Sequence, residues 1–188
     1  MASCPAKRRE GGWRGALCRC LPCAVVLVVI PMPARAFELS GGVNLGVMLA
    51  GTIPRIAVTP NVGISWRTES GVLFAAHDHF SILPATSGAG AGVYNQTSAA
   101  VGYATKTANF SVGPSLSMYS MLTCGVTWCG RVVGVAPGGH AQVSVYFAGP
   151  LGVSLSANLD WIGGRSIVLP GGVAATVVAG PIVRWGPR

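Results

Sequence analysis

From residue 37 onward, hydrophobic residues alternate with small or polar residues at a period of two. In residues 37–49, for example, Val43, Leu45 and Val47 alternate with Gly42, Asn44 and Gly46. Because successive side chains of a β-strand point to opposite faces, this pattern predicts a strand with one apolar and one polar face. The alternation recurs over eight segments, namely 37–49, 56–67, 71–82, 93–104, 109–119, 140–147, 151–161 and 173–185. We therefore expect an all-β protein.

The connections between these segments alternate in length. Those after the second, fourth and sixth segments are tight, at 68–70, 105–107 and 148–150, whereas those after the third, fifth and seventh are longer, at 83–92, 120–139 and 162–172. The first connection, 51–54, is the exception, because it is short although it lies at the end with the longer loops. An even strand count with tight turns at one end predicts an antiparallel up-and-down β-barrel that spans a membrane.

The composition favours lipid over water as the surroundings of this barrel. Only 10% of the residues are charged, although 51% are hydrophobic, and a water-facing surface normally carries about a quarter to a third charged residues. Aromatic residues near the segment ends are typical of the two membrane interfaces; we assign Phe37, Trp66, Trp161 and Trp185 to them. Open strand edges are not tolerated in hydrocarbon, so the strands must close. A soluble exported β-barrel that binds a small ligand is the alternative.

The first 36 residues differ from the rest. A basic start, a short apolar stretch at 21–32 and an Ala34-Arg35-Ala36 end predict a cleaved secretory signal, with the mature barrel domain at 37–188. An N-terminal membrane anchor is the alternative. Cleavage would reduce the net charge from +8 to +3, with seven basic and four acidic residues left. The positive charge of the whole chain is therefore no evidence for nucleic-acid binding.

On this pattern the mature chain resembles the small eight-stranded outer-membrane β-barrels, the OmpA-like and OmpX-like group of porin-type proteins. The resemblance covers residues 37–188 and rests on the alternation rather than on a unique motif. It implies a bacterial outer-membrane location, contact with membrane lipid and lipopolysaccharide, and assembly by the barrel assembly machinery. That machinery reads a terminal aromatic residue, and Trp185 is the candidate, although Gly186, Pro187 and Arg188 follow it.

The densest polar cluster lies in the third segment. His77 and His79 share a face, and two histidines at this spacing on a strand can ligate a metal ion; alternatively, they only line the lumen and form hydrogen bonds there. His79 and Ser81 also share a face, as in barrels that act on lipid A acyl chains. However, a nucleophilic serine needs a base and an orienting acid, and Asp160 is the only acid after position 81.

Several other polar residues are predicted to point into the lumen. Tyr119, His140, Asp160 and Arg184 fall on the polar face of their segments. Charged groups buried in a narrow lumen need partners, although the sequence fixes no particular pair.

The longest predicted loop, 120–139, contains Cys124 and Cys129, which we expect to form a local disulfide in an exported protein. Trp128 would then be presented for contact, and an extracellular ligand would bind through loops 83–92 and 120–139; alternatively, the disulfide only protects the loop from proteases. We expect no cofactor. The favoured function is structural, adhesive or interaction-based rather than enzymatic. A lipid-modifying hydrolase and a narrow pore are the alternatives.

Overall fold

The computed structural model describes residues 37–50, 53–86, 90–124, 129–165 and 170–186. The predicted signal segment, residues 1–36, lies outside this part of the chain. Within the described residues there is no helix long and apolar enough to cross a membrane.

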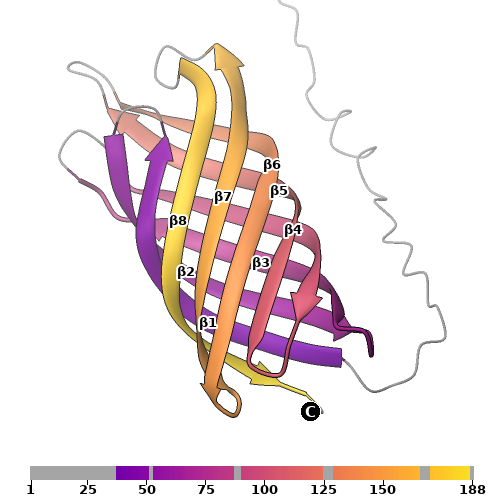
Figure 1. Ribbon diagram of the computed structural model, residues 1–188. Coiled ribbons are helices and arrows are strands. Elements are labelled where there is room, and N and C mark those ends of the chain that lie inside the picture. The colour runs from indigo at the N-terminus through magenta and orange to yellow at the C-terminus, as the bar shows by residue number, and fades with distance from the viewer. Residues whose placement is uncertain (1–36, 51–52, 87–89, 125–128, 166–169, 187–188) are drawn as a thin grey trace, which may run out of the picture. The chain divides into compact units, whose positions relative to one another are not determined.

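The described residues form one closed barrel of eight strands (Figure 1). The strands are β1 (Phe37–Ala50), β2 (Ile53–Arg67), β3 (Val72–Leu83), β4 (Gly92–Ala104), β5 (Ala108–Cys124), β6 (Cys129–Ala148), β7 (Leu151–Arg165) and β8 (Pro170–Trp185). Each strand pairs antiparallel with the next, and β8 returns to β1, where Ala174 lies opposite Ala50 and Trp185 opposite Leu39. The prediction of an all-β, eight-stranded, up-and-down barrel is confirmed.

The two ends of the barrel differ. We call the end that carries the connections 68–71, 105–107 and 149–150 the turn end, and β1 begins and β8 finishes there. We call the opposite end, with the connections at 51–52, 84–91, 125–128 and 166–169, the loop end.

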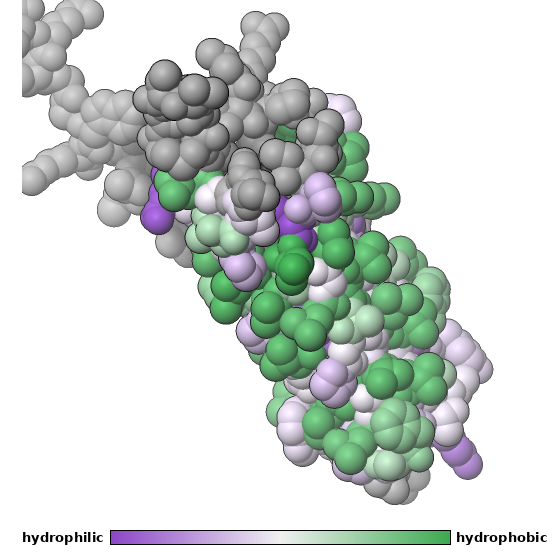
Figure 2. All heavy atoms as spheres, turned by 90° about the vertical axis from the view of Figure 1, so that its left-hand side faces the viewer, coloured by the Kyte–Doolittle hydropathy of each residue, from purple (hydrophilic) through white to green (hydrophobic). Residues whose placement is uncertain are grey.

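The alternation in sequence becomes an inside and an outside in space. Along β7, Leu155 is 51% exposed, whereas its neighbours Ser154 and Ser156 are 3% and 1% exposed. The same inversion holds on the other strands, so that apolar side chains cover the outer surface, as on the face shown in Figure 2, and most of the buried polar side chains lie in the lumen. This distribution is the reverse of a water-soluble protein, in which burial favours apolar groups.

The prediction of a loop over residues 120–139 is wrong. β5 and β6 continue through it as a paired hairpin, and Cys124 lies opposite Cys129 in the register. The hydrophobic alternation is interrupted in this stretch, where a Cβ at Gly134 would overlap the Tyr119 hydroxyl and one at Gly138 the Asp160 carboxylate. Glycine here allows close approach of lumen side chains rather than a turn.

The other two long connections are also shorter than predicted. The loop expected at 83–92 shrinks to 84–91, because Leu83 ends β3 and Gly92 begins β4. The loop expected at 162–172 shrinks to 166–169, because β7 and β8 extend into it with a register shift between Ile162 and Arg165. At the loop end, the strands therefore extend beyond the segments in which hydrophobic and polar residues alternate.

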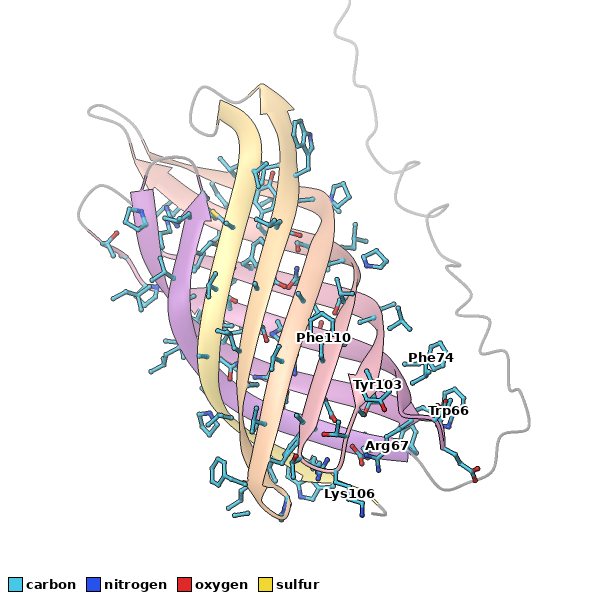
Figure 3. All side chains as sticks on the ribbon, in the orientation of Figure 1. Trp66, Arg67, Phe74, Tyr103, Lys106 and Phe110 are labelled. Atoms are coloured by element: carbon cyan, nitrogen blue, oxygen red, sulfur yellow. The ribbon has the colours of Figure 1, made fainter. Side chains whose placement is uncertain are left out.

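Aromatic residues gather on the outer surface near the barrel ends. At the turn end, the rings of Trp66 and Phe74 stack with centroids 5.2 Å apart, and Figure 3 shows Tyr103 and Phe110 on the same side. The predicted interface residues Phe37 and Trp185 are 52% and 56% exposed at this end, and Trp161 is 61% exposed towards the loop end. Rings at these two levels suit the boundaries between hydrocarbon and water.

Leu155, an exposed leucine near the middle of β7, allows a direct test of whether the outer surface faces lipid. We expect Leu155→Arg to lower the free energy of unfolding in lipid vesicles by about 2–4 kcal/mol, the cost of a cation on a lipid-facing barrel position near the midplane. Urea unfolding followed by tryptophan fluorescence measures it. The matched control is Glu69→Arg at an exposed turn position. We expect it to change the free energy of unfolding by no more than about 0.5 kcal/mol. A similarly small effect at Leu155 would contradict a lipid-facing surface.

Candidate functional site in the barrel lumen

The lumen is closed towards the loop end by an apolar cluster. Its members come from all eight strands and are Met48, Ala57, Leu83, Tyr94, Tyr119, Met121, Ala136, Ile162, Ala174 and Val178, none more than 6% exposed. The predicted lumen residue Tyr119 is thus a member of the apolar cluster. Eight strands leave room only for side chains in the interior, and here large apolar side chains occupy that room.

A buried carboxylate lies below this cluster. Asp160, 1% exposed, accepts hydrogen bonds from the hydroxyls of Tyr94, Ser115 at 3.2 Å and Ser117 at 3.0 Å. These donors come from β4 and β5, across the lumen from β7. The ion pairs in the described part of the chain all involve Glu38, so hydroxyls rather than a cation hold the Asp160 charge.

The three histidines of the chain meet at the same level of the lumen. The ring centroids of His79 and His140 are 5.0 Å apart, those of His77 and His140 5.3 Å, and those of His77 and His79 6.1 Å. All three side chains are buried, at 8% exposure for His77, 2% for His79 and 1% for His140. Sequence analysis had placed His77 and His79 together on β3, and the structure adds His140 from β6.

Small residues on the intervening strands allow these rings to meet. Ser98 on β4 lies opposite His77, and Gly113 on β5 lies opposite His140 in the register. On the other flank, a Cβ at Gly63 would come within 2.7 Å of His77 Nδ1. The positions beside His77, and the β5 position opposite His140, therefore hold residues too small to separate the rings.

The candidate hydrolase pair is not joined in the structure. The Ser81 hydroxyl pairs with that of Thr59 at 2.8 Å, and neither ring nitrogen of His79 forms a hydrogen bond among the described residues. Ser81 is 2% exposed and faces the lumen, away from the lipid-facing surface. This geometry contains neither an activated nucleophile nor access for an acyl chain.

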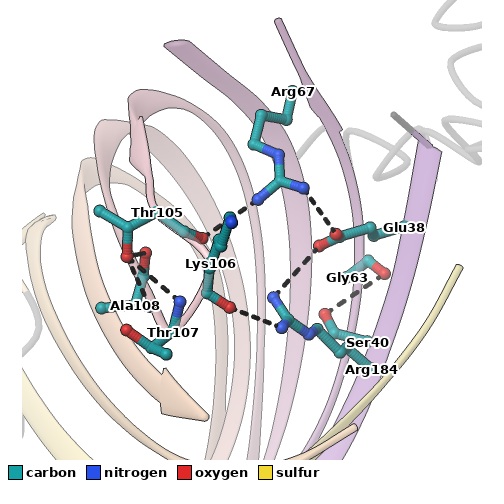
Figure 4. A network of polar contacts seen from close by, with 9 residues as sticks. All are labelled: Glu38, Ser40, Gly63, Arg67, Thr105, Lys106, Thr107, Ala108 and Arg184. Carbon is teal, nitrogen blue, oxygen red and sulfur yellow. Dashed lines mark hydrogen bonds and ion pairs between the residues drawn. The ribbon is translucent and has the colours of Figure 1, made fainter. Parts of the chain in front are cut away.

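An ion-pair network closes the turn end of the lumen (Figure 4). Glu38 lies 3.8 Å from Arg67 and 3.9 Å from Arg184. The two guanidinium groups also donate to backbone carbonyls of the β4–β5 turn, Arg67 to Thr105 at 3.1 Å and Arg184 to Lys106 at 2.9 Å. The network thereby ties β1, β2 and β8 to a turn on the far side of the lumen.

Arg184 and Asp160 point inward at different levels. The guanidinium of Arg184 stacks on the Tyr146 ring, 4.0 Å from its centre, and pairs with Glu38, while Asp160 has the hydroxyls described above. The two charges that the sequence placed in the lumen are therefore satisfied separately.

Two features of the predicted contact surface lie outside the described part. Trp128 and the side chains of Cys124 and Cys129 are not described, so the expected disulfide stays a prediction. The backbone nevertheless places the two cysteines directly opposite each other at the end of the β5–β6 hairpin.

Sequence reasoning missed the partners that reach these groups across the lumen. Tyr94 alternates in phase with Gln96 and so could be placed inside, but nothing local links it to Asp160. His140 on β6 meets the two histidines of β3, which is three strands away around the barrel. This contact depends on the register of every strand between β3 and β6.

The Asp160 network provides a test of the packed lumen. Asp160→Ala leaves three buried hydroxyl donors without their acceptor, so we expect the free energy of unfolding to fall by about 2–3 kcal/mol. Asp160→Asn keeps an oxygen acceptor and should cost less. Urea titrations of the folded barrel in micelles compare the two; equal stability of the alanine variant and the unsubstituted chain would show that the network does not form.

Comparison with known proteins bears on the fold alone. No family profile matches the sequence, and no curated protein matches it. Among solved structures, Neisserial surface protein A matches with a TM-score of 0.54 and 13% identity, over 82% of this chain and 100% of that chain. The N-terminal β-barrel domain of Pseudomonas aeruginosa OprF matches with a TM-score of 0.54 and 11% identity, over 82% and 100%.

Ail, the attachment invasion locus protein of Yersinia pestis, matches with a TM-score of 0.54 and 7% identity, over 80% of this chain and 99% of that chain. All three are eight-stranded outer-membrane barrels. At these identities the likeness concerns architecture, and it covers nearly the whole length of each neighbour. The chain has the fold of the small eight-stranded outer-membrane β-barrels.

Proposed function

We propose that this protein is an integral β-barrel of a bacterial outer membrane, with a structural or adhesive role carried by its loop end. The observation that carries the proposal is the inverted surface: apolar side chains encircle the barrel while serines, asparagines and histidines are buried. Monomeric soluble proteins rarely expose contiguous apolar patches of more than a few hundred Å². Outer-membrane lipid and lipopolysaccharide are accordingly the proposed neighbours of this surface.

The length of the β5–β6 hairpin supports a role for the loop end. β6 has 20 residues and β5 has 17, the two longest strands of the barrel. Val133 and Val135 are 71% and 55% exposed on this hairpin, close to the cysteines that we expect to clamp its tip. Two neighbours in fold, described as a surface protein and as an attachment invasion locus protein, are consistent with contact made beyond the membrane.

The packing of the lumen argues against a diffusion pore. The apolar cluster blocks the loop end and the Glu38 network crosses the turn end, so a solute would have to displace large side chains at one end and ion pairs at the other. Interaction through the exterior of the loop end therefore fits the structure better than transport.

The orientation of the barrel can be tested with inserted tags. We expect a protease-cleavable epitope placed beside Ala85, which is exposed at the loop end, to be removed when protease is added to intact Gram-negative cells. The same epitope beside Ser70, exposed in a turn at the opposite end, should be cleaved only after the outer membrane is permeabilised. Immunoblotting of the two matched insertions reads the result.

Two results would overturn this proposal. One is cleavage of the Ser70 insertion in intact cells together with protection of the Ala85 insertion, which would reverse the orientation. The other is recovery of the chain with soluble periplasmic proteins, which would remove the membrane location.

A further inference from the structure

We propose that His77, His79 and His140 form a binding site for one divalent transition-metal ion inside the barrel. The sequence contains three histidines, and the fold brings all of them together from β3 and β6. Imidazole nitrogens are ligands suited to zinc, copper and nickel ions. The proposal is independent of the role of the loop end.

The spacing of the rings matches the spacing that a shared ion requires. With metal–nitrogen bonds of about 2.1 Å and tetrahedral angles, three ligating imidazoles place their ring centroids about 5 Å apart. The pairs that include His140 are at 5.0 and 5.3 Å, and the remaining pair is at 6.1 Å. Two of the three ring separations are therefore already those of a three-histidine site, and the third, between His77 and His79, is about 1 Å longer.

The rings need to turn rather than to move. Among the described residues, no group of three or more His, Cys, Asp or Glu side chains is arranged to hold a metal ion as it stands. The donor nitrogens must therefore be brought to a common point. The outer side-chain torsion of histidine is broad, and the residues beside His77 on the neighbouring strands, Gly63 and Ser98, are small.

The hydrogen bonds around the histidines leave their metal-binding nitrogens available. His140 Nδ1 lies 2.5 Å from Asn158 Oδ1; because an amide oxygen only accepts, Nδ1 carries the proton and Nε2 keeps its lone pair. Within the part of the chain that the structure describes, Nε2 of His140 and both ring nitrogens of His79 are buried with no hydrogen-bonding partner. His77 Nε2 has one long contact, 3.5 Å to the Ser111 hydroxyl.

Buried polar atoms without partners are unfavourable, and a shared cation would give one nitrogen of each ring a partner. The Asn158 contact matches the way in which metal-bound histidines donate their second nitrogen to an oxygen that fixes the ring. Gln142 also lies near His79 and His140, but its amide is engaged by Ser144 and Ser156 at 3.1 and 3.4 Å.

The local charge also favours a cation. Asp160 and Asn158 both face the lumen from β7, two residues apart, and Asn158 lies opposite His140 in the register. The Asp160 carboxylate is held by hydroxyls, with no ion-pair partner in the described part of the chain. A divalent ion bound at the histidines would place positive charge beside this buried anion.

Metal binding to the whole chain tests this proposal. The chain is purified without a histidine tag, with all six cysteines replaced by serine so that no thiolate ligand remains, then freed of metal and refolded in detergent with Co²⁺. We expect about one retained ion per chain, with the visible absorption bands of tetrahedral Co²⁺, displaced by Zn²⁺. Elemental analysis after desalting gives the stoichiometry.

Four variants separate a metal site from general packing. We expect His79→Gln and His140→Gln to abolish the retained ion, and Asn158→Ala to weaken binding by about 10–100-fold because it removes the residue that orients His140. Ser98→Ala, in the same layer but without a ligand role, should retain the ion. Protease resistance of each refolded variant establishes that its barrel has formed.

The proposal is overturned if the folded unsubstituted chain retains no ion. It is equally overturned if the folded His79→Gln and His140→Gln variants bind as the parent chain does, or if Ser98→Ala loses the ion together with them.

Discussion

The structure depends on one constraint: every backbone hydrogen-bonding group at membrane depth must find its partner within the protein. An unpaired group in hydrocarbon costs several kcal/mol, and an open sheet would leave two unpaired edges. The pairing of β8 with β1, from Leu39 opposite Trp185 to Ala50 opposite Ala174, removes both edges. Closure in turn forces each strand to have one lipid-facing and one lumen-facing side, and the alternation of the sequence follows from that.

Closure with eight strands has a second consequence, which is a lumen too narrow for anything but side chains. Inward residues from strands distant in sequence are therefore brought into contact. The carboxylate of Asp160 meets hydroxyls from β4 and β5, and three histidines meet at one level. Glycines at positions such as Gly63 and Gly138 make the space for these groups.

Much of the fold could be predicted from the sequence because alternation is a local property. A period of two within single strands predicts the eight segments and the inward placement of His77, Asp160 and Arg184. The short interruptions of that period predict the tight turns. The lengths of β5 and β6 could not be predicted in the same way, since glycines that accommodate Tyr119 and Asp160 resemble glycines of a loop.

The candidate site was harder to predict because it depends on which strands face each other across the lumen. His77 and His79 were found through their shared strand face, whereas His140 lies three strands further along the barrel. The partners of Arg184 likewise come from the start of the chain and from a turn in its middle. Contacts of this kind depend on the register of all the strands, and no local pattern records that register.

The most direct test of the inverted barrel compares the behaviour of the purified chain in detergent and in plain buffer. A closed barrel with an apolar exterior should stay monodisperse in detergent micelles, aggregate when the detergent is removed, and migrate differently on a gel before and after boiling. Size-exclusion chromatography with light scattering, together with that gel, measures all three properties. A chain that remains monomeric and folded in buffer without detergent would contradict the lipid-facing surface on which this interpretation of the molecule depends.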